Sequence, residues 1–163
     1  MPATIADDPS VAVPSSARTA AFVAYGLGTA ATVGGLVYAA VDQIVLGGLD
    51  DHLRELYAPV GKYGEAEPLY GYLYVIGVLG LVCWGLNLRL VGDGARKARR
   101  WGWSTWAVAA VPVLAPLVLR EYGQPVIPLG LAAGYLVAWI CGAIGVVALG
   151  RSRRSGPQAH GVR

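Results

Sequence analysis

Charged residues are scarce in this sequence. Asp, Glu, Lys and Arg account for 14% of the 163 residues, and 55% of the residues are hydrophobic, whereas soluble domains carry about 25% charged residues. The few charges flank four long uncharged runs. One soluble core of this size cannot enclose four such runs, but a lipid bilayer can. The composition therefore predicts an integral membrane protein, and its net charge of +3 is too small to indicate nucleic-acid binding.

The sequence also has few residues that bind metals or cofactors. Its two histidines, His52 and His160, lie outside the uncharged runs, so a membrane haem would lack axial histidine ligands. Cys83 and Cys141 lie inside such runs, form no CxxC pair and have no histidine nearby. A redox motif or a zinc site is therefore not indicated. We expect no metal site and no cofactor.

Residues for catalysis or proton transfer inside a membrane are missing as well. No uncharged run has a carboxylate at its centre, where a small proton-coupled exporter would need one. Ser104 is the only serine in the four predicted spanning segments, and none of them contains a histidine, which argues against a serine protease. The sequence thus predicts a protein that is not an enzyme.

The uncharged runs have the length of membrane-spanning helices. We place four helices over these runs and their flanks, at residues 19–46, 69–91, 101–119 and 126–150. At about 1.5 Å per residue, each is long enough to cross a hydrocarbon core of roughly 30 Å. Pro112 and Pro116 lie inside the third run and predict a bend there, because each removes a backbone hydrogen bond. The predicted fold class is an all-α integral membrane four-helix bundle.

The two ends of the chain differ from this core in composition. Residues 1–18 contain three prolines with several serines and alanines, which is typical of a flexible arm. Residues 151–163 are basic and then polar and glycine-containing, which predicts a disordered tail. The transmembrane domain is accordingly predicted at 19–150.

The longest connection, between the first two helices, has its own pattern. Leu49, Leu53 and Leu56 repeat at helical spacing after Asp50, a plausible N-cap, and Pro59 ends the pattern. This predicts a short amphipathic helix that lies on the membrane surface. A soluble loop with one helical turn is the alternative.

Basic residues are distributed unevenly between the two sides that four crossings define. Ten lie on the side of both termini and the central loop, and three lie on the other side. Since basic residues in short loops stay cytoplasmic, we expect both termini in the cytoplasm. The scarcity of lysine, with abundant alanine, glycine and valine, is typical of a GC-rich bacterium such as an actinobacterium. The predicted location is therefore the cytoplasmic membrane of a bacterium.

Small residues recur on one face of two predicted helices. The fourth helix has four of them at four-residue spacing, and the first has a similar face. Such faces let helices approach closely in a membrane. They either build the bundle itself or pair two copies of the protein. The residues concerned are Gly28, Gly35, Gly130, Gly134, Ala138 and Gly142.

Basic residues of the central loop and of the tail meet at the cytoplasmic surface. Each cation near an anionic leaflet contributes about 1 kcal/mol to binding, so these residues predict contact with anionic lipid headgroups. The alternative is that they only set the topology. They are Arg96, Lys97, Arg99, Arg100, Arg151, Arg153 and Arg154.

Polar residues also gather at the opposite, outer surface. Asp42 comes first among them, because an ionisable group in a membrane segment is a functional candidate, and Arg120 is its candidate ion-pair partner. Together they form either an ion pair or a small outer vestibule that binds a ligand. The set is Asp42, Gln43, His52, Glu67, Arg120, Glu121 and Gln124.

Three isolated polar or thiol residues lie within the spanning segments. Cys83 and Cys141 should reach similar depth, and they either touch or are two separate buried small side chains. Asn87, near the inner end of the second helix, is interpreted as a packing residue and not as a ligand-binding residue.

The order of loops resembles one known group. The segment Leu-Asp-Asp-His-Leu-Arg-Glu-Leu-Tyr (49–57), the basic central loop and the turn Arg120-Glu121-Tyr122-Gly123 resemble uncharacterised actinobacterial four-helix membrane proteins, and the layout is similar to the DoxX-like group. The resemblance covers helix number and loop lengths. It brings no functional motif and implies no site residues.

Two functions follow as hypotheses. The first is a non-enzymatic membrane protein that acts through helix–helix association with a membrane-protein partner or with itself. The second is a transport protein that binds a lipid or small molecule through the outer polar cluster around Asp42 and Arg120.

Overall fold

The computed structural model describes residues 15–93 and 95–151. Within them the chain forms a bundle of four helices that are long and apolar enough to cross a membrane. These are α1 (Ser15–Val41), α3 (Glu67–Asp93), α4 (Ala95–Val118) and α5 (Leu129–Arg151). The all-α class and the four long helices are confirmed.

The helix boundaries differ most from the predicted ones in three places, whereas the ends of the second helix differ by two residues each. Residues 15–18 were assigned to the flexible arm but form the first turn of α1, and α4 begins six residues earlier than predicted, at Ala95. The fourth helix begins later, at Leu129, because Pro125 and Pro128 delay it. The rest of the arm and the tail from residue 152 lie outside the described residues.

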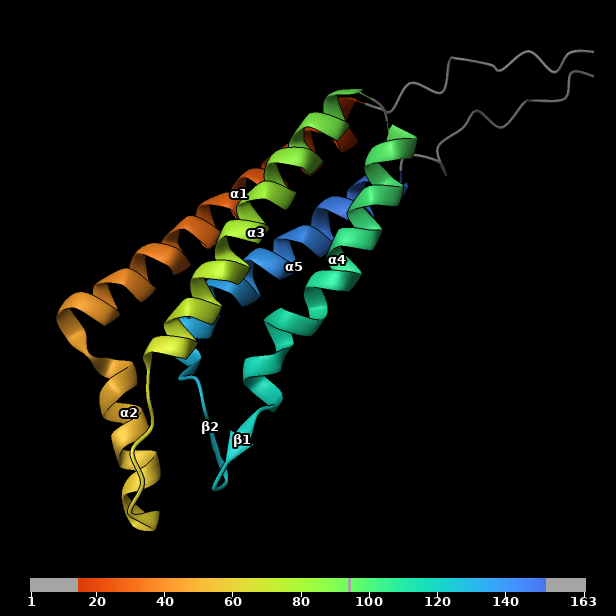
Figure 1. Cartoon of the computed structure of the whole chain (residues 1–163). Helices are drawn as coiled ribbons and strands as arrows, with labels where there is room; N and C mark the ends of the chain where they lie inside the picture. Colours follow the sequence, from red (N-terminus) through yellow and green to blue (C-terminus); the bar gives the residue numbers. More distant parts are fainter. Residues whose placement is uncertain (1–14, 94, 152–163) are drawn as a thin grey trace, which may run out of the picture.

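The four helices pack in a ring (Figure 1). α1 packs most extensively against α5 and next against α3, and α4 packs against α5 and less extensively against α3. α1 and α4 begin, and α3 and α5 end, at what we call the basic end, where Arg18, Arg89 and Lys97 lie. The other end carries two extra elements and is called the hairpin end.

The contact between α1 and α5 depends on glycine. A Cβ atom on Gly134 would lie 2.9 Å from the Cα of Gly35 and 3.1 Å from the carbonyl oxygen of Ala31. The two backbones therefore touch at this crossing, which only a residue without a side chain permits.

Gly28 and Gly142 serve a different contact, with the ring of Trp84 on α3. A Cβ on Gly28 would lie 2.7 Å from this ring, and one on Gly142 would lie 3.1 Å from it. Ala138 is buried on the same face of α5, and a Cβ on Gly130 would lie 3.7 Å from the hydroxyl of Tyr38. All six predicted packing residues thus face inward or contact neighbours within the chain.

The predicted amphipathic helix is present at the hairpin end as α2 (Gly48–Tyr57), followed by a 3₁₀ turn (Ala58–Val60). Its leucines Leu49, Leu53 and Leu56 are buried against Ala39, Tyr70, Leu73 and Ile127. This burial supplies the stabilisation that a ten-residue helix lacks on its own. The alternative of a loop with a single helical turn is therefore wrong.

The N-cap of α2 is not Asp50 as predicted. α1 continues through a π-helical turn (Asp42–Leu46), and Gly47 then takes a left-handed conformation with φ of 65°. This turn brings the carboxylate of Asp42 over the start of α2, where it accepts hydrogen bonds from the backbone N–H of Gly48 at 3.2 Å and of Leu49 at 3.0 Å. Asp42 therefore caps α2 from outside the helix.

The bend predicted in α4 follows from its two prolines. Because Pro116 has no N–H, the carbonyl of Pro112 loses its helical partner. The hydroxyl of Tyr72 on α3 donates a hydrogen bond to this carbonyl, and Figure 1 shows the α4 ribbon changing direction in this half. The bend is thus fixed by a side chain from the neighbouring helix.

α4 and α5 are joined by a small antiparallel hairpin of β1 (Arg120–Glu121) and β2 (Gln124–Pro125). Its turn places Tyr122 at φ of 52° and Gly123 at φ of 86°. Together with α2, this hairpin covers the hairpin end of the bundle (Figure 1).

Candidate functional site

A cavity of about 480 Å³ lies inside the bundle, between the four long helices. Its volume is within the range of small-molecule sites, roughly 300–1,000 Å³. Four of the five tryptophans line it, namely Trp84, Trp101, Trp106 and Trp139. Among the described residues that line it, none is charged or histidine. The cavity thus suits an uncharged and mainly apolar molecule.

The cavity opens sideways between α3 and α4. Leu79 on α3 and Val108 on α4 both line it, yet their side chains are 59% and 73% exposed. The lining residues of α1 and α5 are buried or partly buried. The opening is therefore on the apolar flank of the bundle and not at either end.

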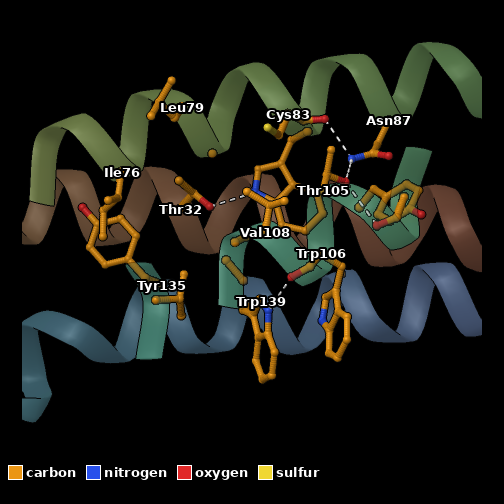
Figure 2. Close-up of a pocket in the computed structure, with 18 of the residues that line it drawn as sticks. Thr32, Ile76, Leu79, Cys83, Asn87, Thr105, Trp106, Val108, Tyr135 and Trp139 are labelled. Carbon is orange, nitrogen blue, oxygen red and sulfur yellow. Dashed lines mark hydrogen bonds between the residues drawn. The ribbon is translucent and has the colours of Figure 1, made fainter. Parts of the chain in front are cut away.

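Figure 2 shows the cavity running along the helices from Ile76 and Tyr135 to Asn87 and Thr105. The amide nitrogen of Asn87 donates hydrogen bonds to the carbonyl of Cys83 at 2.9 Å and to the hydroxyl of Thr105 at 3.4 Å. Since a carbonyl only accepts, these contacts fix which way the amide points. Its oxygen, Oδ1, is then left free.

Three buried polar atoms of the cavity lining have no hydrogen-bond partner within the described part of the chain. They are the hydroxyl of Tyr25, Oδ1 of Asn87 and Nε1 of Trp106. Each such atom costs about 1–3 kcal/mol when it is left unpaired. By contrast, Nε1 of Trp84 donates to Thr32 at 3.0 Å, and Nε1 of Trp139 donates to the carbonyl of Trp106 at 3.1 Å. All three unpaired atoms thus belong to the lining of this cavity.

Two of these atoms face the same small space. A Cβ on Gly102 would lie 3.1 Å from the hydroxyl of Tyr25 and 3.6 Å from Oδ1 of Asn87, with a methyl group of Val146 at 3.0 Å. Because Gly102 has no side chain, both polar atoms approach its backbone closely, and a methyl group there would crowd the hydroxyl of Tyr25. The two unpaired atoms therefore lie near each other in the cavity lining, beside Gly102.

The predicted outer polar residues are at the hairpin end, but they do not form one site. Asp42 is only 3% exposed and also accepts a hydrogen bond from the hydroxyl of Tyr70 at 2.7 Å, so three protein donors occupy its carboxylate. Arg120 is exposed on β1. In residues 15–93 and 95–151 the one ion pair is Arg54–Asp51, at 3.5 Å on the surface. The Asp42–Arg120 ion pair is therefore not formed.

Two of the remaining members, His52 and Glu121, join α2 to the hairpin. Nε2 of His52 donates to the carbonyl of Pro125 at 2.8 Å, and the hydroxyl of Tyr57 donates to the carboxylate of Glu121, which raises the pKa of Tyr57. Gln43 accepts a hydrogen bond from Tyr74 at 2.6 Å. Glu67 and Gln124 are exposed.

The predicted lipid-binding residues lie at the basic end as far as they are described. Lys97, Arg100 and Arg151 are exposed, and Arg99 is partly exposed. The side chain of Arg96 and all of Arg153 and Arg154 lie outside the described residues. The basic end therefore exposes positively charged side chains at its surface.

Sequence reasoning missed the cavity. It interpreted Asn87 as a packing residue and did not single out Tyr25 or Gly102, all of which the structure brings together. Of the two free thiols, Cys83 lines the cavity and Cys141 does not. The available signal was an amide in an otherwise apolar run together with tryptophans on several helices.

No protein-family model, curated protein or solved structure matches this chain.

Proposed function

We propose that this chain is a multi-pass membrane protein that takes a lipophilic small molecule from the surrounding bilayer into its central cavity. The observation that carries the proposal is the 480 Å³ cavity with three unpaired buried polar atoms. A bound molecule would supply the missing hydrogen bonds, and its apolar part would contact the aromatic walls.

The position of the opening supports uptake from the bilayer. The candidate spanning segments of α3 and α4 include both residues at the mouth, Leu79 and Val108. In a membrane this mouth faces lipid tails, so a membrane-dissolved molecule enters without crossing water. The uncharged lining argues against an ionic cargo, since an unpaired ion is costly to bury.

The proposed site differs from both sequence-based hypotheses. The outer residues around Asp42 and Arg120 contact protein groups or solvent separately, so a ligand finds no common vestibule there. Association with another chain through the small-residue faces stays a prediction. The packing of Gly35 against Gly134 within the chain is the reason we place the function in the cavity.

The cavity is tested by filling it. Ala109 lines the cavity from α4, whereas Ala107, two residues earlier, is exposed and does not line it. We expect Ala109→Phe to lower the lipophile that co-purifies in mild detergent about tenfold, because the added ring occupies the site. Solvent extraction and mass spectrometry measure this amount per chain.

The matched control is Ala107→Phe, which adds the same ring outside the cavity and should retain wild-type amounts of bound lipophile. Equal retention by both variants, with both folded by thermal melting, would show that the bound molecules sit elsewhere and would refute the proposed function.

We further propose that the basic end faces the cytoplasm, which the ten-to-three distribution of basic residues supports. The two lysines test this directly, because Lys62 follows α2 at the hairpin end and Lys97 lies at the basic end. A membrane-impermeant amine reagent applied to intact cells should modify Lys62 and spare Lys97, as mapped by peptide mass spectrometry. Modification of Lys97 alone would reverse the orientation.

A further inference from the structure

The polar group that the cavity recognises is defined by the atoms around Gly102. Tyr25 and Asn87 are 1% and 4% exposed, so water outside the protein does not satisfy them. Both approach the position that a Cβ on Gly102 would occupy. We call these two unpaired atoms beside Gly102 the recess; they belong to one end of an apolar cavity.

The chemistry of the two atoms selects a group that carries a hydrogen-bond donor. Oδ1 of Asn87 only accepts a hydrogen bond, whereas the phenol of Tyr25 both donates and accepts. A group that bridges them must donate to Asn87 and can accept from Tyr25. A hydroxyl does both, whereas an ether or a ketone can only accept and leaves Asn87 unpaired. An ionised carboxylate cannot donate and finds no cation among the described lining residues.

The place of the recess agrees with this choice. Tyr25 and Gly102 lie near the starts of α1 and α4, and Asn87 lies near the end of α3, so all three are toward the basic end. The rest of the cavity extends from Asn87 toward Ile76 and Tyr135 (Figure 2). The hydroxyl of Tyr135 at that far end already donates to the carbonyl of Leu73 at 3.0 Å. An amphiphile with its polar head toward the membrane surface and its chain toward the membrane centre therefore matches the cavity.

We propose that the ligand is a neutral amphiphile with a hydroxyl head, and that this hydroxyl bridges Tyr25 and Asn87 above Gly102 while the hydrocarbon chain lies along the tryptophan-lined cavity. This inference rests on the proposed function, since it specifies what the same cavity binds. A trapped water molecule in the recess is the competing occupant.

The test uses quenching of tryptophan fluorescence by brominated probes. The probes are a fatty alcohol brominated along its chain, its methyl ether and the fatty acid of the same length, each added to the full chain in detergent micelles. We expect the alcohol to bind about tenfold more tightly than the ether, because the ether leaves Oδ1 of Asn87 unpaired. The acid should bind less tightly than the alcohol at a pH where it is ionised.

Three variants connect this preference to the recess. Asn87→Leu and Tyr25→Phe each remove one polar atom. Gly102→Ala adds a methyl group 3.1 Å from the hydroxyl of Tyr25 and so displaces it. Each variant should reduce the alcohol's affinity to that of the ether. Tyr74→Phe is the control and should keep the preference, because Tyr74 does not line the cavity and its hydroxyl is already paired with Gln43.

The outcomes separate this inference from the proposed function. Equal affinity of wild-type protein for alcohol and ether, with Ala109→Phe still blocking both, overturns the hydroxyl assignment and leaves cavity binding standing. An alcohol preference that survives in Gly102→Ala and Tyr25→Phe overturns the placement above Gly102. Quenching that is the same in wild type and Ala109→Phe for every probe overturns the proposed function and this inference together.

Discussion

Gly134→Leu is expected to prevent the four helices from forming their bundle. A Cβ at this position already meets the Cα of Gly35 at 2.9 Å and the carbonyl oxygen of Ala31 at 3.1 Å, and backbone atoms cannot move aside as a side chain can. Separating α1 from α5 removes the most extensive packing in the molecule. We expect a loss of about 3 kcal/mol or more, measured by unfolding in mixed detergent micelles.

Gly34→Leu is the matched control for this prediction. Gly34 precedes the glycine at the crossing, but a Cβ there has no atom within 4 Å. The same leucine should therefore leave the unfolding transition close to that of the wild type. If Gly134→Leu instead unfolds like the wild type and changes only the oligomeric state, the glycine face joins separate chains, and the association hypothesis replaces the packing described above.

Local sequence patterns predicted much of the fold, because the features concerned depend on residues that are close together in the chain. Four uncharged runs require four buried or lipid-facing helices, and the leucines of α2 repeat at the spacing of one helical face. The cap of α2 was predicted wrongly because only residues within the segment itself were considered. Asp50 is the obvious cap within the segment, whereas the actual one, Asp42, reaches it only through a π-helical turn and the left-handed Gly47.

The cavity was beyond prediction because it depends on how helices far apart in the sequence are arranged. Asn87 and Thr105 come from α3 and α4, and Tyr25 comes from α1; no spacing along the chain relates them. The hydrogen bond from Tyr72 to the carbonyl of Pro112 was beyond prediction for the same reason, since these residues also come from different helices. The sequence shows that a proline frees a carbonyl, but only the packed structure shows which residue binds it.

Trp84→Ala is expected to cause the second large loss of stability. The indole of Trp84 reaches from α3 to Gly28 on α1 and Gly142 on α5, and its nitrogen donates to Thr32 at 3.0 Å. Removing a buried tryptophan ring costs about 3–5 kcal/mol, because it leaves a hole that the backbone does not fill. Trp84 is partly buried, so we expect a loss of about 3 kcal/mol, near the lower end of this range. Trp103→Ala on α4 is the control and should cost far less, since Trp103 is 46% exposed and does not line the cavity.

A double substitution distinguishes the packing of the Trp84 ring against Gly28 from a general loss of buried apolar surface. Gly28→Leu alone should also destabilise the protein, because its Cβ would lie 2.7 Å from the ring. In the Trp84→Ala background the same leucine enters the space that the ring has left. The double variant should therefore lose less free energy of unfolding than the two single variants added together, by at least about 1 kcal/mol. Strict additivity in micelle unfolding would mean that the two residues do not share this contact. It would also remove the reason for glycine at position 28.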